Sequence, residues 1–144
     1  MPERGRKEIK MKSLFEPKTK TVPNLTVFDS MKDKALDLLS HSEKSQYTQA
    51  IVLRSAGGNE YSTIIRNALS EDKMDEKSLL RKMQEAKDSE ICFVLCMWQD
   101  NCVDIPSFAF RKLLLESNEK NSDTTLFVMT ADGVSEMKLS VTMK

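Results

Sequence analysis

Apolar residues recur every three or four positions in four segments of this chain, which is the spacing of an amphipathic helix. In such a helix the apolar side chains form one stripe that packs on a core, and the polar side chains face water. We therefore predict four helices. The first begins near Asn24, and the other three run from Tyr61 to Leu69, from Lys73 to Lys87 and from Ile105 to Leu114.

The second of these segments, residues 60–69, allows two interpretations. Read as the return arm of a hairpin, it places Ile64 on the opposite face from Tyr61 and Ile65. Read as a helix, it has Asn59 as a suitable N-cap and places all of its apolar residues on one face. We therefore predict a helix whose apolar face is formed by Tyr61, Ile64, Ile65, Ala68 and Leu69.

Short apolar segments rich in β-branched and aromatic residues predict strands. Residues 89–98 are apolar on both faces, which is typical of a central buried strand. The Asp132-Gly133 pair favours a tight hairpin turn between the last two strands. The predicted strands are residues 48–54, 89–98, 124–130 and 136–143.

The order of these elements is a leading helix followed by β-α-α-β-α-β-β. Strands joined through helices imply right-handed crossovers and parallel pairing. We therefore predict an α/β fold with a small, mostly parallel sheet of about four strands, closed by a C-terminal antiparallel hairpin. Residues 24–144 are predicted to form a single globular domain, and residues 1–23, which are charged and interrupted by prolines, a basic disordered tail.

Composition narrows the class of protein. A chain of 144 residues that is 40% apolar and 31% charged suits one globular domain. No stretch approaches the ~20 apolar residues of a membrane helix, and the N-terminus lacks the apolar core of a signal peptide. Three cysteines, an odd number, do not form a disulfide framework. The expected location is the cytoplasm, the nucleus or both, without membrane contact.

Charge is divided unevenly along the chain. Residues 1–20 carry seven basic and three acidic side chains, a net charge of +4, and because the whole chain is neutral the remainder carries −4. A basic tail of this kind can contact polyanions, so weak nucleic-acid binding is one hypothesis. The basic residues of this candidate contact are Arg4, Arg6, Lys7, Lys10 and Lys12.

The same tail holds three apolar residues, Met11, Leu14 and Phe15, at the spacing i, i+3 and i+4. This is the spacing of a short helix that lies in a groove of a partner protein. The alternative is that the three side chains pack back on the domain. We predict that they bind a partner.

A glycine-containing loop is the second candidate site. Gly57 and Gly58 lie between the predicted strand 48–54 and the predicted helix that Asn59 caps. Backbone N–H groups at a strand-to-helix junction can hold phosphate, and glycines allow close approach. The loop contains neither a GxGxxG nor a GxxxxGK[ST] motif, so the alternative is a tight turn with an asparagine cap.

Residues of the types used in catalysis and metal binding are few. His41 is the sole histidine of the chain and is expected to contact helix-terminal carbonyls. Cys102 precedes a predicted helix, where a thiol pKa can fall, but Asp100 and Asp104 oppose that effect. The acidic cluster of residues 71–76 is interpreted as a solvated helix start. We therefore predict no metal site and no cofactor.

These observations favour a non-enzymatic protein-interaction module, a small subunit or adaptor of an intracellular assembly. It would bind one or more proteins through residues 11–15 and through the C-terminal edge strand. The first alternative is an accessory factor that contacts nucleic acid through the basic tail. The second is a small enzyme that binds a nucleotide or phosphate at Gly57, Gly58 and Asn59.

Overall fold

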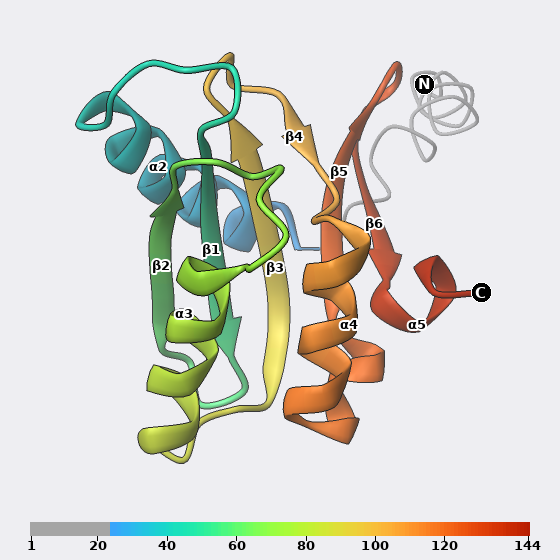
Figure 1. Cartoon of the computed structure of the whole chain (residues 1–144). Coiled ribbons are helices and arrows are strands. Elements are labelled where there is room, and N and C mark those ends of the chain that lie inside the picture. The colour runs from blue at the N-terminus through green and yellow to red at the C-terminus, as the bar shows by residue number, and fades with distance from the viewer. Residues whose placement is uncertain (1–23) are drawn as a thin grey trace, which may run out of the picture.

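The computed structural model describes residues 24–144, which form one sheet with helices on both of its faces (Figure 1). None of the helices in this part of the chain combines the length and the apolar character needed to span a bilayer. In chain order the elements are α2 (Leu25–Ser40), β1 (Gln49–Ser55), β2 (Glu60–Ile65), α3 (Met74–Glu85), β3 (Ile91–Trp98), β4 (Val103–Asp104), α4 (Phe108–Ser117), the 3-10 helix η1 (Glu119–Asp123), β5 (Thr125–Thr130), β6 (Gly133–Lys138) and α5 (Leu139–Thr142).

The sheet has six strands in the order β2-β1-β3-β5-β6, and the short strand β4 pairs with β3. Among the described strands, β3 and β5 run parallel, whereas each of the other neighbouring pairs is antiparallel. The predicted mixture of helices and strands is confirmed. The predicted sheet of about four mostly parallel strands is wrong, because the sheet is larger and mostly antiparallel.

The error begins at residues 61–69, which were predicted as a helix: Glu60–Ile65 form the strand β2, and residues 66–69 lie in the loop that follows it. Gly58 adopts a φ of 85°, which lets the chain turn back tightly, and β2 pairs with β1 over its whole length. Tyr61 and Ile65 then contact the core on one face of the sheet, and Ile64 contacts the core on the other. Apolar residues on both faces argue against a strand only if one face is exposed to water.

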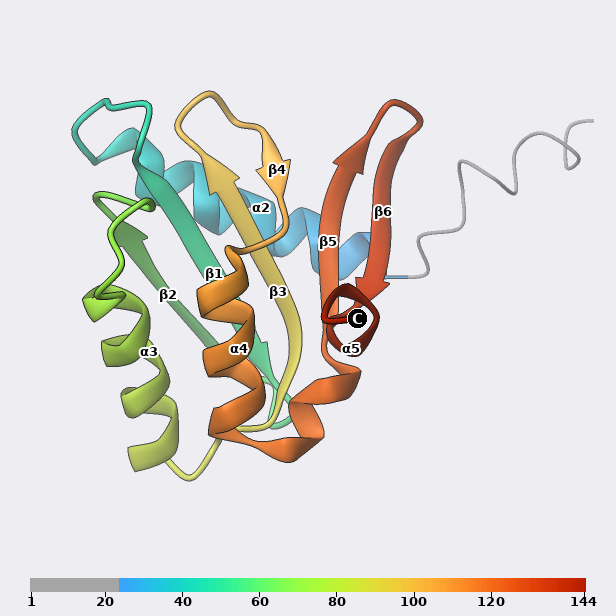
Figure 2. The same ribbon diagram turned by 45° about the vertical axis from the view of Figure 1, so that its right-hand side comes forward.

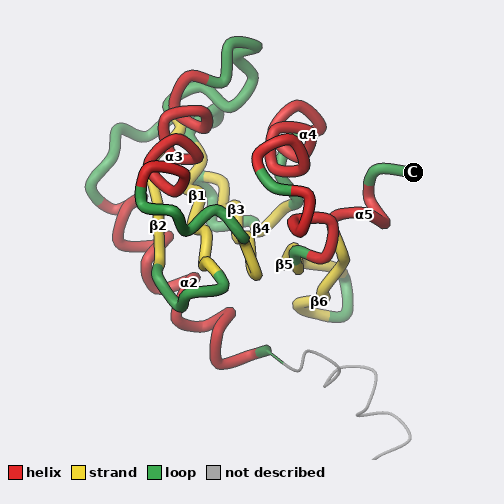
Figure 3. Tube along the Cα trace, turned by 90° about the horizontal axis from the view of Figure 1, so that it is seen from below, coloured by secondary structure: helices red, strands yellow, loops and turns green. Residues whose placement is uncertain are grey.

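Both faces of this sheet are covered, as Figures 2 and 3 show: α2 lies against one face, and α3 and α4 lie against the other. Strand β1 alternates between the two cores, with Val52 toward α2 and with Ile51 and Leu53 toward α3 and α4. Strand β3 alternates in the same way. This two-sided burial explains why residues 91–98 are apolar without a break.

The C-terminal hairpin of β5 and β6 is confirmed, but its turn consists of Ala131 and Asp132, one residue earlier than the predicted Asp132-Gly133 pair, because Gly133 begins β6 and pairs with Thr130. The predicted last strand, residues 136–143, is too long, because β6 ends at Lys138. Leu139 begins the short helix α5, is fully buried in the core that contains α3 and α4, and donates its N–H to the carbonyl oxygen of Thr124 over 2.8 Å. Burial of this leucine therefore turns the chain out of the sheet.

One buried asparagine joins three elements on the α3 and α4 side. Asn121, in η1, has a relative exposure of 0%. Its Oδ1 accepts from the backbone N–H of Ile91 at the start of β3 over 2.7 Å, and its Nδ2 donates to the carbonyl oxygen of Leu114 in α4 over 2.9 Å. The side chain thus fixes α4 against the first residue of the central strand.

We expect Asn121→Ala to lower the free energy of unfolding by about 2 kcal/mol, because it leaves the buried N–H of Ile91 without its acceptor and removes one of the two donors to the Leu114 carbonyl oxygen. Urea denaturation followed by circular dichroism measures the change. Lys120→Ala, which removes an exposed side chain from the same 3-10 helix, is the control and should change stability by less than about 0.5 kcal/mol. Equal values for the two variants would contradict the role given to Asn121.

Candidate functional site

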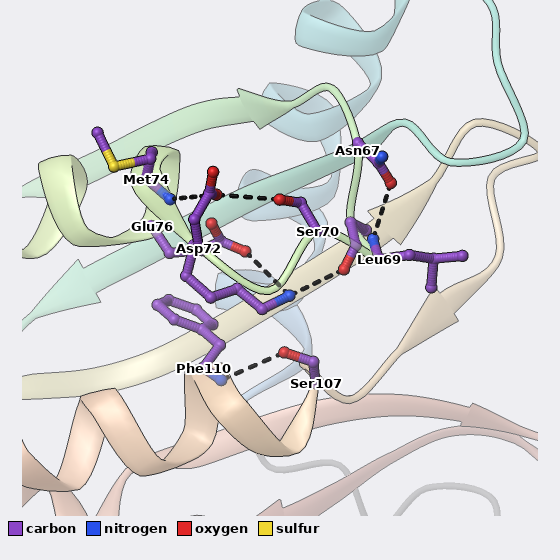
Figure 4. Close-up of polar contacts among 10 residues, drawn as sticks. Asn67, Leu69, Ser70, Asp72, Met74, Glu76, Ser107 and Phe110 are labelled. Carbon is purple, nitrogen blue, oxygen red and sulfur yellow. Dashed lines mark hydrogen bonds and ion pairs between the residues drawn. The ribbon is translucent and has the colours of Figure 1, made fainter.

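The helices α3 and α4 begin at the same end of the sheet, and a small cavity lies between their first turns (Figure 4). Its volume is about 140 Å³. Apolar side chains such as Ile51 and Ile105 form much of its wall, and the uncharged polar residues Gln49 and Ser107 also line it. The charged ones are Lys73, Glu76 and Asp104.

Lys73 and Glu76 form a buried ion pair in this cavity. The Nζ of Lys73 lies 3.7 Å from Oε2 of Glu76, and the two side chains are only 7% and 5% exposed. The same Nζ donates a 2.8 Å hydrogen bond to the carbonyl oxygen of Ala68. Charged groups are rarely buried to this extent unless they are paired or have a function.

The loop before α3 directs Lys73 inward. Lys73 is the N-cap residue of α3 and has a φ of 51°, in the left-handed region that residues other than glycine seldom adopt. Asp72 takes the capping role instead, because its Oδ1 accepts from the backbone N–H of Met74 over 3.2 Å. Met74 points away from Glu76 (Figure 4) and is 65% exposed. The lysine therefore enters the cavity, and the methionine remains at the surface.

Burial raises the pKa of Glu76 above its usual value of 4.5, and the neighbouring Lys73 ammonium opposes this effect. A carboxyl group with a raised pKa is better suited to exchange a proton near neutral pH than an exposed one. Glu76 also lies in the first turn of α3, where the helix dipole favours a negative charge. It is the group in this cavity best suited to proton transfer.

The start of α4 forms the opposite wall. Ser107 is the N-cap residue, and its Oγ accepts from the backbone N–H of Phe110 over 3.2 Å. The Phe110 ring is buried and lines the cavity. Asp104 ends β4, and its Oδ2 accepts from Nε1 of Trp98 over 3.3 Å.

A wide groove of about 1090 Å³ lies beside the cavity. Three residues, Leu69, Trp98 and Asp104, line both spaces, so the cavity and the groove are direct neighbours. Tyr47 and Met129, both partly exposed, form apolar parts of the groove. The combined site offers a ring-sized inner space and a larger outer one.

The loop predicted as a phosphate site has another role. Gly57, Gly58 and Asn59 turn between the antiparallel strands β1 and β2, not between a strand and a helix. The carboxylate of Asp88 fills this turn: its Oδ2 accepts from Ser55 Oγ over 2.7 Å, and from Asn59 Nδ2 and the Tyr61 hydroxyl, each over 2.9 Å.

These hydrogen bonds, led by those from Asn59 and Ser55, lower the pKa of Asp88. A Cβ atom on Gly57 would lie 2.9 Å from Oδ1 of Asp88. Glycine at this position therefore allows the Asp88 carboxylate to lie close to the backbone of the turn. The carboxylate of Asp88 therefore uses the side-chain donors of this turn.

The remaining sequence candidates lie apart from the cavity or outside the described residues. His41 ends α2, with its Nδ1 2.9 Å from the carbonyl oxygen of Asp37, as predicted. Cys102 is exposed, lines the groove and is followed by β4, not by a helix as predicted. The tail residues Met11, Leu14 and Phe15, and the basic residues of the tail, lie outside residues 24–144.

The interpretation of residues 71–76 as a solvated helix start is wrong for two of them, since Lys73 and Glu76 are buried. The sequence offers only a weak signal for this pair, namely a lysine three residues before a glutamate at a helix start. Nowhere in residues 24–144 do three His, Cys, Asp or Glu side chains gather closely enough to hold a metal ion.

Comparison with known proteins finds similarity in structure only. No protein-family model matches the chain, and no curated protein matches it in sequence. Among solved structures, the chain is similar to cytidine deaminase from Mycobacterium leprae with a TM-score of 0.60 and 16% identity, covering 81% of this chain and 96% of that one. For the cytidine deaminase from Bacillus anthracis the TM-score is 0.64, the identity 11% and the coverage 81% and 86%. For the cytidine deaminase from Burkholderia pseudomallei the TM-score is 0.58 and the identity 12%, and the similarity covers 78% of this chain and 93% of that one.

This similarity corrects the functional prediction made from the sequence. The described fold resembles that of cytidine deaminases, which are enzymes, whereas the sequence favoured a non-enzymatic adaptor. Neither the adaptor nor its alternatives, a nucleic-acid accessory factor and a phosphate-binding enzyme built on the glycine loop, is supported by this comparison. The resemblance is one of fold, since the identities lie between 10% and 16%.

The Asp88 turn gives a test that depends on pH. We expect Asp88→Ala to lower the melting temperature at pH 7, because the native state loses an ionised acceptor of three side-chain hydrogen bonds. An Asp whose native pKa is depressed stabilises the fold above its unfolded pKa of 3.8, and this contribution is lost as the pH falls through the lower native pKa. The difference between wild type and variant should therefore shrink below about pH 4.

Thermal melts followed by circular dichroism between pH 2 and 7 measure this difference. Asp33→Ala, which removes an exposed carboxylate from α2, is the control and should follow the wild type throughout. A difference between Asp88→Ala and wild type that stays constant down to pH 2 would show that the carboxylate charge is not responsible.

Proposed function

We propose that this protein binds a small molecule of the nucleoside or nucleobase class, with the ring in the cavity between α3 and α4 and with Glu76 as its proton-exchanging partner. The observation that carries the proposal is the buried Lys73–Glu76 pair, which lies in a ring-sized cavity at the start of two helices. The similarity in fold to cytidine deaminases supports the choice of ligand class.

The size of the cavity suits a single ring. A cavity of about 150 Å³ in another protein holds benzene, and the cavity here measures about 140 Å³. The sugar of a nucleoside would lie in the neighbouring groove, beside Trp98 and Tyr47. Mostly apolar walls with a few converging polar groups are typical of sites for small molecules.

The polar groups of the cavity complement a heteroaromatic ring. The Lys73 ammonium offers a donor and the Glu76 carboxylate an acceptor, 3.7 Å apart. Nucleobases present adjacent donor and acceptor groups along one edge. After the Glu76 carboxylate has taken a proton from water, it can give that proton to a ring nitrogen, and the carboxylate that forms again lies beside the Lys73 ammonium, which stabilises it.

The zinc ion of the nucleobase deaminases does not fit the residues present here. As a class, the zinc deaminases carry the signature H-x-E … P-C-x-x-C, in which His and Cys hold the metal and Glu exchanges protons. This chain has Met74-Asp75-Glu76 and Pro106-Ser107-Phe108-Ala109-Phe110 at matching spacings. The glutamate is retained, whereas the ligand positions hold Met74, Ser107 and Phe110.

None of these three side chains is a zinc ligand in proteins, where thiolate, imidazole and carboxylate groups prevail. Met74 lies at the surface, the Ser107 hydroxyl caps α4, and Phe110 has no donor atom. We therefore derive no step that involves a metal.

Ligand binding tests the proposal directly. We expect at least one of cytidine, deoxycytidine, uridine, adenosine and the corresponding free bases to raise the melting temperature and to bind measurably in isothermal titration calorimetry. Glu76→Gln should weaken that binding by at least about tenfold, since it removes a charged hydrogen-bond partner. Absorbance and ammonia assays of the bound compound show whether it is converted.

Glu85→Gln is the matched control, because Glu85 is an exposed glutamate of the same helix. It should bind the compound as the wild type does. If no compound binds, or if Glu76→Gln and Glu85→Gln bind equally well, the proposed function is wrong.

A further inference from the structure

We propose that the ammonium group of Lys73 is the built-in cation of the α3–α4 cavity and that this site works without a bound metal ion. This inference rests on the proposed function, because it concerns the same cavity. It starts from a mismatch: the fold resembles that of the cytidine deaminases, but the positions of the zinc-deaminase signature hold no metal ligands.

The position of the ammonium group is fixed from two sides. Its Nζ lies 2.8 Å from the carbonyl oxygen of Ala68, in the loop before α3, and 3.7 Å from Oε2 of Glu76, in the first turn of that helix. Ser107 and Phe110 at the start of α4 line the same cavity. The charge therefore lies where the two helix starts meet, beside the signature glutamate, which is retained.

A metal ion at the signature positions would lie close to this ammonium group, because Lys73 directly precedes Met74 and pairs with Glu76. At short range two cations repel each other, and more strongly in a poorly solvated cavity than in water. The N-terminal end of α3 adds positive potential. The Lys73 side chain is only 7% exposed and contacts both Glu76 and the carbonyl oxygen of Ala68, so it would have to break both contacts to make room for a dication.

The backbone supports the same conclusion. Lys73 holds a left-handed φ of 51°, which costs free energy for a residue other than glycine. That conformation turns the lysine inward and leaves Met74, which has the signature spacing to Glu76, 65% exposed. The strained backbone conformation of Lys73 is therefore the one that places its ammonium group in the cavity.

Metal content is the first test. The purified full-length protein is incubated with zinc chloride, desalted and analysed by inductively coupled plasma mass spectrometry. We expect far less than one zinc per chain and no change of melting temperature on addition of EDTA. One zinc per chain, with a melting temperature that falls when EDTA removes it, would overturn the proposal.

The second test asks whether Lys73 supplies the charge that Glu76 needs. Lys73→Met should lower the melting temperature, because it leaves a buried carboxylate without its partner, and Lys73→Met/Glu76→Leu should recover most of the loss, because both charges are gone. Lys82→Met, an exposed lysine of the same helix, is the control and should leave the melting temperature unchanged.

If Lys73→Met behaves like Lys82→Met, or if the double variant is no more stable than Lys73→Met, Lys73 is not the compensating cation and the proposal fails. Should Lys73→Met not fold, the double variant and the zinc content of the wild type still decide. Both tests are made without a nucleoside, so failure of the ligand panel leaves their outcomes unaffected.

Discussion

The Lys73–Glu76 ion pair determines the charge and polarity of the cavity at the end of the sheet where α3 and α4 begin. Removing two charges from water costs several kcal/mol for each ion, and pairing repays this cost only when the geometry is good and the remaining hydrogen bonds are made. Here Ala68 provides a further hydrogen bond, and the first turn of α3 favours the carboxylate. Hydrophobic residues of similar volume would stabilise the fold as well, so stability alone does not explain the pair.

The fold holds that pair in place through layers that are buried on both sides. Strands β1 and β3 supply the cores on both faces of the sheet, so α3 and α4 are fixed against a sheet that α2 supports from behind. Asn121 adds a polar connection between α4 and the first residue of β3. A cavity between two helix starts keeps its shape only if both helices are fixed in this way.

The sequence predicts the helices at residues 73–87 and 105–114 and the buried central strand well, because their apolar spacing is strong. It fails at residues 60–69, where apolar side chains on both faces of a strand also match a helical stripe, and that one error converts an antiparallel pair into a predicted crossover. It also fails at Lys73 and Glu76. Charged residues at a helix start are usually exposed to solvent, so the sequence predicts a solvated turn here. Lys73 and Glu76 are buried because Lys73 has a positive φ and because α4 packs nearby.

The fold of this protein resembles that of cytidine deaminases, whereas the residues of its candidate site differ from the zinc-deaminase signature. Cytidine deaminases share the arrangement of strands and helices at 10% to 16% identity, because a layered fold needs only apolar residues of suitable size and spacing. Chemistry depends on individual residues, and here a glutamate with the signature spacing remains while the metal-ligand positions hold a thioether, a hydroxyl and a phenyl ring. In the proposed function, the cavity holds the ring and Glu76 exchanges the proton. The positions that match the zinc ligands of the deaminase signature hold no residue types that bind zinc and activate water on it.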